Sequence, residues 1–302
     1  MQLRHRIEYA ATAFMLGICR RLPANAVYRL FRGFGKLMYH VLASRTKLVL
    51  RNMEIAFPGK TLEERKVLAK NCYANLSDSM AFNTLMMCGR FTNEELLESV
   101  EIEGWENYEK AMALTKKGLL IFTAHIGNWE LLPQYAALRL DEKIYAVARK
   151  TTNPLLEEKI VLPLRERFGV DVFYKKNALM RIMKALNKGG HAGILIDQKL
   201  QPPEGIYVDF FGKKAPTTGS SGLLQVRFGV IALPAFMVKI GSGKHRLILR
   251  EPIQWEDNGK SMEDQVFELT RIHQQIVEEI IQEYPDQWFW MHNRWGLKKS
   301  ER

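Results

Sequence analysis

Residues 118–130 read Gly-Leu-Leu-Ile-Phe-Thr-Ala-His-Ile-Gly-Asn-Trp-Glu, a segment in which an apolar run gives way to a polar turn. A short run without polar alternation is typical of a strand that is buried on both faces of a parallel sheet. His125 follows at the carboxyl end of this strand, and open α/β sheets bind their ligands at that edge. The segment therefore indicates an α/β fold with a titratable side chain at its functional edge.

Outward from this strand, the rest of the chain alternates in the same way. Helical periodicity covers residues 62–90 and 262–283, and a Pro at position 285 ends the second of these helices. Further apolar runs of strand length occupy residues 144–148, 170–174, 192–196, 231–238 and 246–249. The alternation predicts an α/β fold with a central, mostly parallel sheet flanked by helices. Residues 198–218 are rich in Pro and Gly, and we expect them to form a long functional loop.

The positive charge of the chain is concentrated at its beginning. The whole chain of 302 residues has a net charge of +11, and residues 1–51 alone have a net charge of +9. This segment is also rich in apolar residues, which favours a lipid surface over nucleic acid as its partner. We therefore expect residues 1–51 to be a membrane-binding helical region and residues 52–302 to be the α/β domain.

How the N-terminal region meets the membrane is left open by the sequence. The apolar run over residues 7–19 contains Glu8 and is shorter than the roughly 20 residues of a confident spanning helix. Beyond it, apolar residues recur at helical spacing through Val41 with basic residues between them, as in a helix that lies in the interface. No small-residue cleavage site follows the run, so we expect the segment to remain attached.

The three cysteines, Cys19, Cys72 and Cys88, have no metal-binding spacing. They are expected to be structural thiols of a protein in a reducing compartment.

The candidate chemistry centres on His125 and Glu130. In one continuous helix, a step of five residues would point the two side chains roughly 140° apart, so a turn through Gly127 is required for them to meet. With that turn, Glu130 can orient the imidazole ring, and the pair can act as a general base on an acceptor hydroxyl. The alternative is a satisfied structural histidine at the end of a strand.

Several motifs, in order along the chain, resemble those of the late acyltransferases of lipid A biosynthesis. The first is the His-x4-Glu element of residues 125–130, and the others lie at residues 146–154, 194–198, 210–218, 232–234 and 288–295. The last of these reads Trp-Phe-Trp-Met-His-Asn-Arg-Trp. Together the matches cover about residues 1–296.

This resemblance implies transfer of a fatty acyl chain from acyl–acyl carrier protein to a hydroxyl of a lipid A precursor. The reaction is expected at the cytoplasmic face of a Gram-negative inner membrane, with acyl carrier protein and membrane lipids as partners and no metal or redox cofactor. A direct transfer is implied, and residues 219–222, Gly-Ser-Ser-Gly, lack the Gly-x-Ser-x-Gly pattern and are expected to follow no strand. Two alternatives stay open: an acyltransferase for another membrane lipid, and a non-enzymatic peripheral membrane protein.

Six further residues are candidates for substrate binding. Arg149 is expected to bind a phosphate of the acceptor or of the carrier's prosthetic group. Asp197 ends an apolar strand and is expected to pair with Arg149 or with a lysine, either at the site or as a structural ion pair. Asn128 is expected to cap the following helix or to donate a hydrogen bond to the oxyanion. The remaining candidates, which come from the matching motifs, are Asn153, Gln198 and Arg294; Arg294 has structural packing as its alternative.

Overall fold

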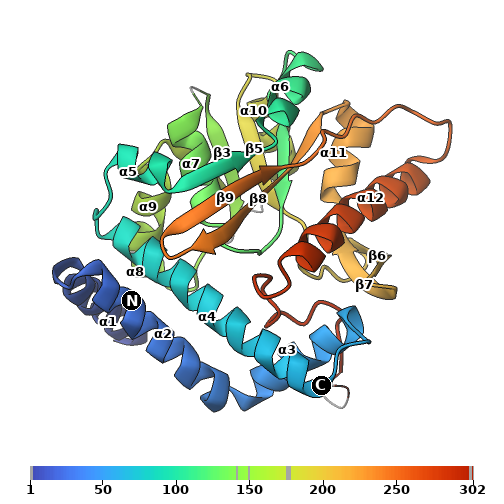
Figure 1. Ribbon diagram of the computed structural model, residues 1–302. Coiled ribbons are helices and arrows are strands. Elements are labelled where there is room, and N and C mark those ends of the chain that lie inside the picture. The colour runs from blue at the N-terminus through green and yellow to red at the C-terminus, as the bar shows by residue number, and fades with distance from the viewer. Residues whose placement is uncertain (1–2, 141, 149, 175–177, 299–300, 302) are drawn as a thin grey trace.

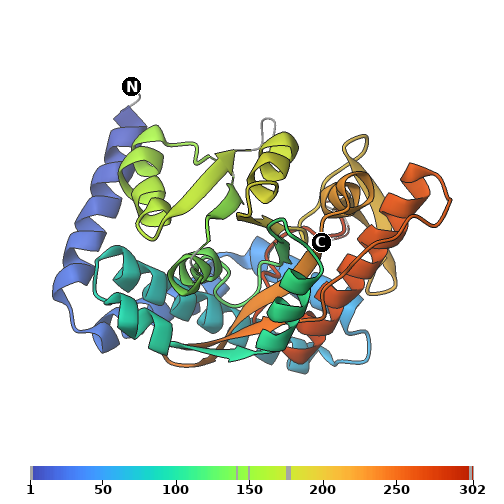
Figure 2. The ribbon, with the colours of Figure 1, turned by 90° about the horizontal axis from the view of Figure 1, so that it is seen from above.

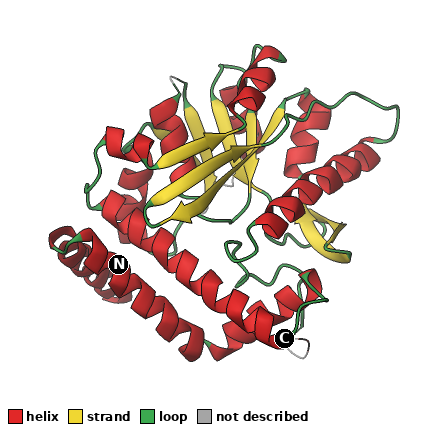
Figure 3. Ribbon diagram, in the orientation of Figure 1, coloured by secondary structure: helices red, strands yellow, loops and turns green. Residues whose placement is uncertain are grey.

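In the computed structural model of the chain, a central sheet lies between two layers of helices (Figure 3). The structure describes residues 3–140, 142–148, 150–174, 178–298 and 301. The sheet has seven strands in the order β1-β9-β8-β2-β5-β3-β4. Their bounds are β1 Val100–Glu103, β2 Leu120–Thr123, β3 Ile144–Ala148, β4 Val170–Tyr174, β5 His191–Leu195, β8 Ala232–Gly241 and β9 Lys244–Leu249.

Neighbouring strands of this sheet run parallel, except for the antiparallel pair of β8 and β9. The mixed α/β architecture and the mostly parallel sheet are therefore confirmed. The larger helices are α1 Leu3–Arg21, α2 Ala24–Val41, α3 Ala43–Ala56, α4 Leu62–Met87, α7 Leu131–Arg139, α10 Ala178–Leu186, α11 Ser220–Phe228 and α12 Met262–Glu283. The shorter ones are α5 Asn93–Glu98, α6 Trp105–Ala113, α8 Pro154–Leu156, the π-helical turn η1 Glu157–Val161 and α9 Leu162–Glu166.

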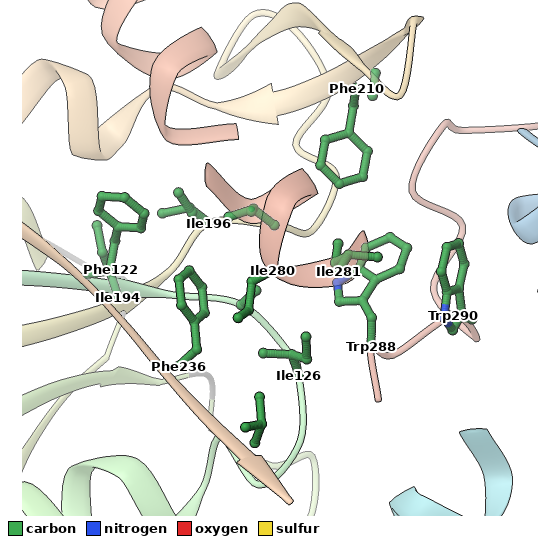
Figure 4. Close-up of a cluster of buried hydrophobic side chains, with 14 of the residues drawn as sticks. Phe122, Ile126, Ile194, Ile196, Phe210, Phe236, Ile280, Ile281, Trp288 and Trp290 are labelled. Carbon is green, nitrogen blue, oxygen red and sulfur yellow. The ribbon is translucent and has the colours of Figure 1, made fainter. Parts of the chain in front are cut away.

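Each face of the sheet buries its own core. Phe122 and Ile194 point to the side covered by α3, α10, α11 and α12, where the C-terminal residues Trp288 and Trp290 also pack (Figure 4). The opposite face packs against α5, α6 and α7 and against part of α4. Burial on both faces explains why the central strands read as continuous apolar runs in the sequence.

The N-terminal helices α1 and α2 form an outer layer along α4 (Figures 1 and 2). Close packing of α2 on α4 depends on Gly35, because a Cβ there would lie 1.9 Å from the Ser77 hydroxyl. Arg32 on α2 adds an ion pair with the buried Asp78 of α4. Among the described residues, no helix is long and apolar enough to span a membrane. Helix α3 continues through residue 51, so the boundary expected there lies within a helix.

Two details of the fold differ from the sequence-based expectations. Residues 198–218 are not a long irregular loop, because they contain the antiparallel hairpin of β6 (Gly205–Phe210) and β7 (Lys213–Thr218). Strand β7 was not predicted, because its sequence, Lys-Lys-Ala-Pro-Thr-Thr, contains a Pro and does not alternate between polar and apolar residues. The edge strand β1 was also missed, because its alternating sequence Val-Glu-Ile-Glu is only four residues long.

Gly127 is required by the turn that follows β2, and this can be tested by stability. Its φ is +57°, and a Cβ would lie 2.2 Å from the backbone oxygen of Met237. We expect Gly127→Ala to lower the free energy of unfolding by about 3 kcal/mol or more, because backbone strain adds to a backbone clash. Gly229 is the matched control: its φ is +60°, but no atom lies within 4 Å of the added Cβ.

Denaturant unfolding of both variants separates the two effects. Gly229→Ala should lose only the roughly 1 kcal/mol of a left-handed alanine. Equal losses in the two variants would contradict the steric role of Gly127.

Candidate active site

The turn after β2 places His125 at the carboxyl edge of the sheet and holds it through backbone hydrogen bonds. The His125 carbonyl accepts a hydrogen bond of 2.8 Å from the Phe289 amide, and the Gly127 amide donates to Gln287 O at 3.0 Å. On the other side, the Asn128 amide donates to Met237 O at 2.8 Å. The turn is therefore fixed between β8 and the C-terminal segment.

The His125 ring is oriented by Asp197, which follows β5. Asp197 Oδ1 lies 2.8 Å from His125 Nδ1, and Asp197 Oδ2 accepts from the His125 backbone amide at 2.9 Å. Oδ2 also accepts a hydrogen bond of 2.7 Å from the Trp288 indole. The carboxylate is only 1 % exposed, so its charge is compensated within the protein.

Glu130 does not make the hydrogen bond that the sequence assigned to it. Among the described residues its contact is with Arg165, whose Nη2 lies 3.5 Å from Glu130 Oε1. The turn through Gly127 exists as expected, but Glu130 stands at the N-cap position of α7 without a side-chain capping bond, while the end of β5 brings Asp197 to His125 Nδ1. Asp197 instead pairs with His125, and no lysine is bonded to it among the described residues. Arg149, the other predicted partner of Asp197, lies outside the described residues.

The charges around the ring favour its protonated form. Burial alone would lower the pKa of His125, but the charge of Asp197, its hydrogen bond and a smaller effect of the Glu130 charge raise the pKa above its usual value. Burial alone would raise the pKa of Asp197, yet the charge and hydrogen bonds of His125, with that of Trp288, lower the pKa to about 2. Asp197 is thus ionised at neutral pH, and His125 is a strengthened base.

The other ring nitrogen faces a polar side chain and a cavity. The Gln198 side-chain nitrogen lies 3.1 Å from His125 Nε2. When Nδ1 carries the proton and donates to Asp197, Nε2 accepts from Gln198. A substrate hydroxyl that replaces this amide would donate its proton to Nε2, which is the geometry of a general base.

The cavity beside His125 has a volume of about 1120 Å³ and is mostly apolar. One part of it runs along the sheet face beneath α7, where Ile121, Leu233 and Ala235 line it, and another part reaches α10, α11 and α12, with Leu179, Leu223 and Val266 in its lining. Its lining reaches from His125 at the carboxyl ends of the strands to His191 at the start of β5. The length of the sheet is thus available to an extended apolar ligand.

Arg165 is a member of the site that the sequence did not reveal. It lines the cavity next to Glu130, and its Nη1 atom is buried without a hydrogen-bond partner among the described residues. In the sequence, Arg165 stands beside Glu166 and Arg167, and such mixed charge is typical of a solvated helix surface. Only the folding of α9 against the carboxyl edge brings this cation into the cavity.

Three residues that the sequence predicted as substrate ligands, Asn128, Asn153 and Arg294, make structural contacts instead and do not line the cavity. Asn128 is buried and bonds to Asn83 at 2.8 Å, so it neither caps α7 nor points to the cavity. Asn153 caps α8 and donates to His5 O and Glu8 Oε2 of α1.

Arg294 is fully buried, and its contacts favour a role in structural packing over one in substrate binding. It donates to Pro216 O, Thr217 Oγ1 and Gln274 Oε1, and its guanidinium lies 4.6 Å from the Phe210 ring centre. The structure describes five of the six candidates, and of these five only Gln198 lines the cavity. Asp197 does not line the cavity but bonds to Nδ1 of the His125 ring.

The Gly-Ser-Ser-Gly segment does follow a strand, contrary to expectation, because β7 ends at Thr218. Ser221 Oγ lies 2.8 Å from His273 Nδ1, and His273 Nε2 lies 2.8 Å from Gln225 Oε1. Both Ser221 and His273 are buried, and burial lowers the pKa of His273 to about 3. Since neither lines the cavity, this pair is part of the core between α11 and α12.

The described residues contain no cluster of three or more His, Cys, Asp or Glu side chains suited to a metal ion. All three cysteines are free and buried, as expected for structural thiols.

Comparison with known proteins identifies the family of the chain. Residues 1–297 match the family described as bacterial lipid A biosynthesis acyltransferase, and the chain belongs to this family. The lipid A biosynthesis lauroyltransferase of Escherichia coli K12 is 26 % identical over 94 % of this chain and 90 % of its own. The palmitoleoyltransferase of the same organism is 23 % identical over 96 % and 92 %, and the myristoyltransferase is 23 % identical over 82 % and 74 %. The protein is thus an acyltransferase.

Which carboxylate governs His125 can be tested by pH profiles. In the wild type, the charge of Asp197 holds His125 Nδ1 and raises the pKa of His125. Asp197→Asn removes this charge, so we expect turnover to fall by about 10² to 10⁴-fold. We expect the neutral ring to act as the base, so that kcat/KM rises with pH through the raised pKa of His125. In Asp197→Asn this midpoint should move to lower pH.

Glu130→Gln is the matched control because it also removes one carboxylate charge near the ring. It leaves the Asp197 hydrogen bond in place, so we expect a smaller displacement of the midpoint. A larger displacement in Glu130→Gln than in Asp197→Asn would show that Glu130 is the principal partner of the ring.

Proposed function

We propose that this acyltransferase transfers a fatty acyl chain from acyl–acyl carrier protein to a hydroxyl of a lipid A precursor. The observation that carries the proposal is the buried Asp197–His125 pair at the mouth of a long apolar cavity. His125 Nε2 removes the proton of the acceptor hydroxyl as its oxygen attacks the thioester carbonyl. The thiol of the carrier leaves, and the proton on His125 is available to it. The relatives named above support lipid A as the acceptor.

The apolar cavity is the proposed site of the acyl chain. Each methylene that leaves water for an apolar site contributes about 0.8 kcal/mol, so a chain that fills the cavity is selected over a shorter one. Gly193 lines the cavity, and a Cβ added there would contact only Tyr145 O, at 3.7 Å, so a larger side chain could take up part of this space. The thioester then lies at the His125 end, near Gln198.

Arg165 and Glu130 are proposed to act on the reacting groups. The unpartnered Nη1 of Arg165 can bind the phosphate of the carrier's prosthetic group or the negative charge that develops on the carbonyl oxygen. Its ion pair with Glu130 holds the guanidinium at the wall of the cavity that His125 also lines. This assigns to Arg165 the role that the sequence assigned to Arg149.

We also propose that the protein acts at the cytoplasmic face of the inner membrane, through α1 and α2. Both helices expose apolar side chains at helical spacing; on α1 these are Leu3, Ile7, Phe14 and Ile18, and on α2 they are Leu30, Phe34, Leu37 and Val41. Such stripes, flanked by the basic residues of this region, support a location in the interface of an anionic leaflet. The transfer itself needs no metal or redox cofactor in this proposal.

Mass spectrometry of lipid extracts tests the function. Cells of a Gram-negative host that express the chain should gain an acyl group on lipid A, and the added mass reports the chain length that the cavity accepts. We expect a folded His125→Ala variant to lose about 10² to 10⁴-fold in rate, because the general base is gone. A changed phospholipid or aminolipid with unchanged lipid A would show that the acceptor is another membrane lipid. Full activity in His125→Ala would contradict the mechanism.

Membrane attachment is tested by replacing two exposed phenylalanines. Phe14 and Phe34 are 71 % and 51 % exposed, so Phe14→Ser with Phe34→Ser should leave the core intact. We expect binding to anionic vesicles to weaken at least tenfold, because two apolar side chains no longer enter the interface, an effect of about 1.4 kcal/mol or more. Flotation of vesicles measures the bound fraction.

Phe267→Ser is the matched control, since Phe267 is 42 % exposed on α12, outside the N-terminal helices. Equal losses in the control and in the double variant would contradict a specific role of α1 and α2.

A further inference from the structure

A second, smaller cavity lies between α2 and the turn that joins β8 to β9. It has a volume of about 380 Å³ and is lined by Asn25, Tyr28, Arg29, Arg32 and Ser242. We call it the α2 cavity. It shares no lining residue with the apolar cavity beside His125, and neither acyl transfer nor the fold accounts for its polar lining.

An unpartnered hydroxyl points to a ligand in the α2 cavity. Tyr28 is only 8 % exposed, and its buried hydroxyl has no hydrogen-bond partner among the described residues. Leaving such a group unpaired costs about 1–3 kcal/mol, so buried hydroxyls normally have partners. Burial, followed by the charge of Asp78, raises the pKa of Tyr28 to about 12, and the neutral hydroxyl is therefore a donor at physiological pH.

The surrounding groups are donors and cations. Arg32 is bound to Asp78 through Nε and Nη2, and Lys239 contacts the same carboxylate. Arg29 has no acidic partner among the described residues, and no acidic side chain lines the cavity. Two cations, Arg32 and Lys239, thus share the carboxylate of Asp78, and Arg29 adds a third positive charge. The group has a surplus of two positive charges that an anion can neutralise.

We propose that the α2 cavity binds the phosphate monoester headgroup of a membrane lipid, with Tyr28, Arg29 and Ser242 as its donors. A phosphate monoester has a charge of about −1.5 to −2 at pH 7, which matches the surplus of the cluster. Its several oxygens can accept from the hydroxyls of Tyr28 and Ser242 and from the guanidinium of Arg29.

The position of the cavity favours a lipid over a free phosphate ester. At about 100° per residue, Leu30, Phe34 and Leu37 share one exposed face of α2, and Arg29 lies roughly 105° around the helix from the centre of that face, with Lys36 and Arg32 farther round. When the apolar face enters the interface, Arg29 lies at its border, at the level of the headgroups. The inference rests on the proposed membrane contact of α1 and α2, and the experiment separates the two.

The test compares binding of the full chain to two kinds of phosphatidylcholine vesicle. One contains phosphatidylglycerol, a phosphodiester, and the other contains phosphatidic acid, a monoester, at matched surface charge. We expect wild type to bind the phosphatidic acid vesicles roughly tenfold more tightly, and Tyr28→Phe and Arg29→Gln to lose this preference. Lys36→Gln, which removes the same charge from a residue outside the cavity, should weaken binding to both kinds of vesicle equally and keep the preference.

Several outcomes would overturn the proposal. Equal binding of wild type to both vesicles, or a preference that persists in Tyr28→Phe and Arg29→Gln, excludes a monoester site while membrane contact stands. Absence of binding to either vesicle refutes the membrane contact and the α2 cavity site with it. Glycerol 3-phosphate that binds as tightly as the phosphatidic acid vesicles would show that the ligand is not a lipid. Tyr28→Phe should leave the melting temperature unlowered, and a fall would mean that the hydroxyl is bonded internally.

Discussion

The buried carboxylate of Asp197 is the interaction on which the site depends. It joins three parts of the chain: β5, which precedes it, the turn at His125, and Trp288 of the C-terminal segment. Burying a charge is unfavourable unless its partners are in place, and here three N–H groups lie within 2.9 Å of its two oxygens. Any displacement of the C-terminal segment would remove one of them. The ring of His125 is therefore oriented only when the whole chain is folded.

The C-terminal segment is in turn held by buried polar contacts. Asn52 of α3 donates to Trp290 O and His292 O at 2.8 Å. Arg294 bonds to Gln274, whose side-chain nitrogen donates to Ile196 O next to Asp197. Burial lowers the pKa of Arg294 to about 10, so the guanidinium stays charged at neutral pH despite its surroundings. The tryptophan-rich end of the chain thus stabilises the candidate active site. This explains why the segment contains polar residues such as Arg294 although it does not line the cavity.

The sequence predicted the fold well because buried parallel strands leave a local signal. The runs at 144–148 and 170–174 coincide with β3 and β4, and the helix 262–283 coincides with α12. The site was predicted in part, since the placement of His125 after a strand is also local. Its partners are not: Asp197 and His125 are 72 residues apart, and only the adjacency of β2 and β5 brings them together. Glu130 is only five residues from His125, so the sequence suggested it as the partner of the ring. The actual partner, Asp197, is distant in sequence and follows a neighbouring strand.

Asn153 connects the N-terminal helix α1 to the carboxyl edge of the sheet. Its side chain accepts from Leu155 to cap α8, and it donates to the backbone of His5 and to Glu8 on α1. The residue follows β3 at the same carboxyl edge of the sheet that bears His125. Glu8 is the acid that interrupts the apolar run of α1, and the ion pair with Arg4 and the bond to Asn153 lower its pKa. An acid that is unfavourable for a spanning helix is therefore explained by a structural contact, one that fixes α1 to the segment that follows β3 at the carboxyl edge of the sheet.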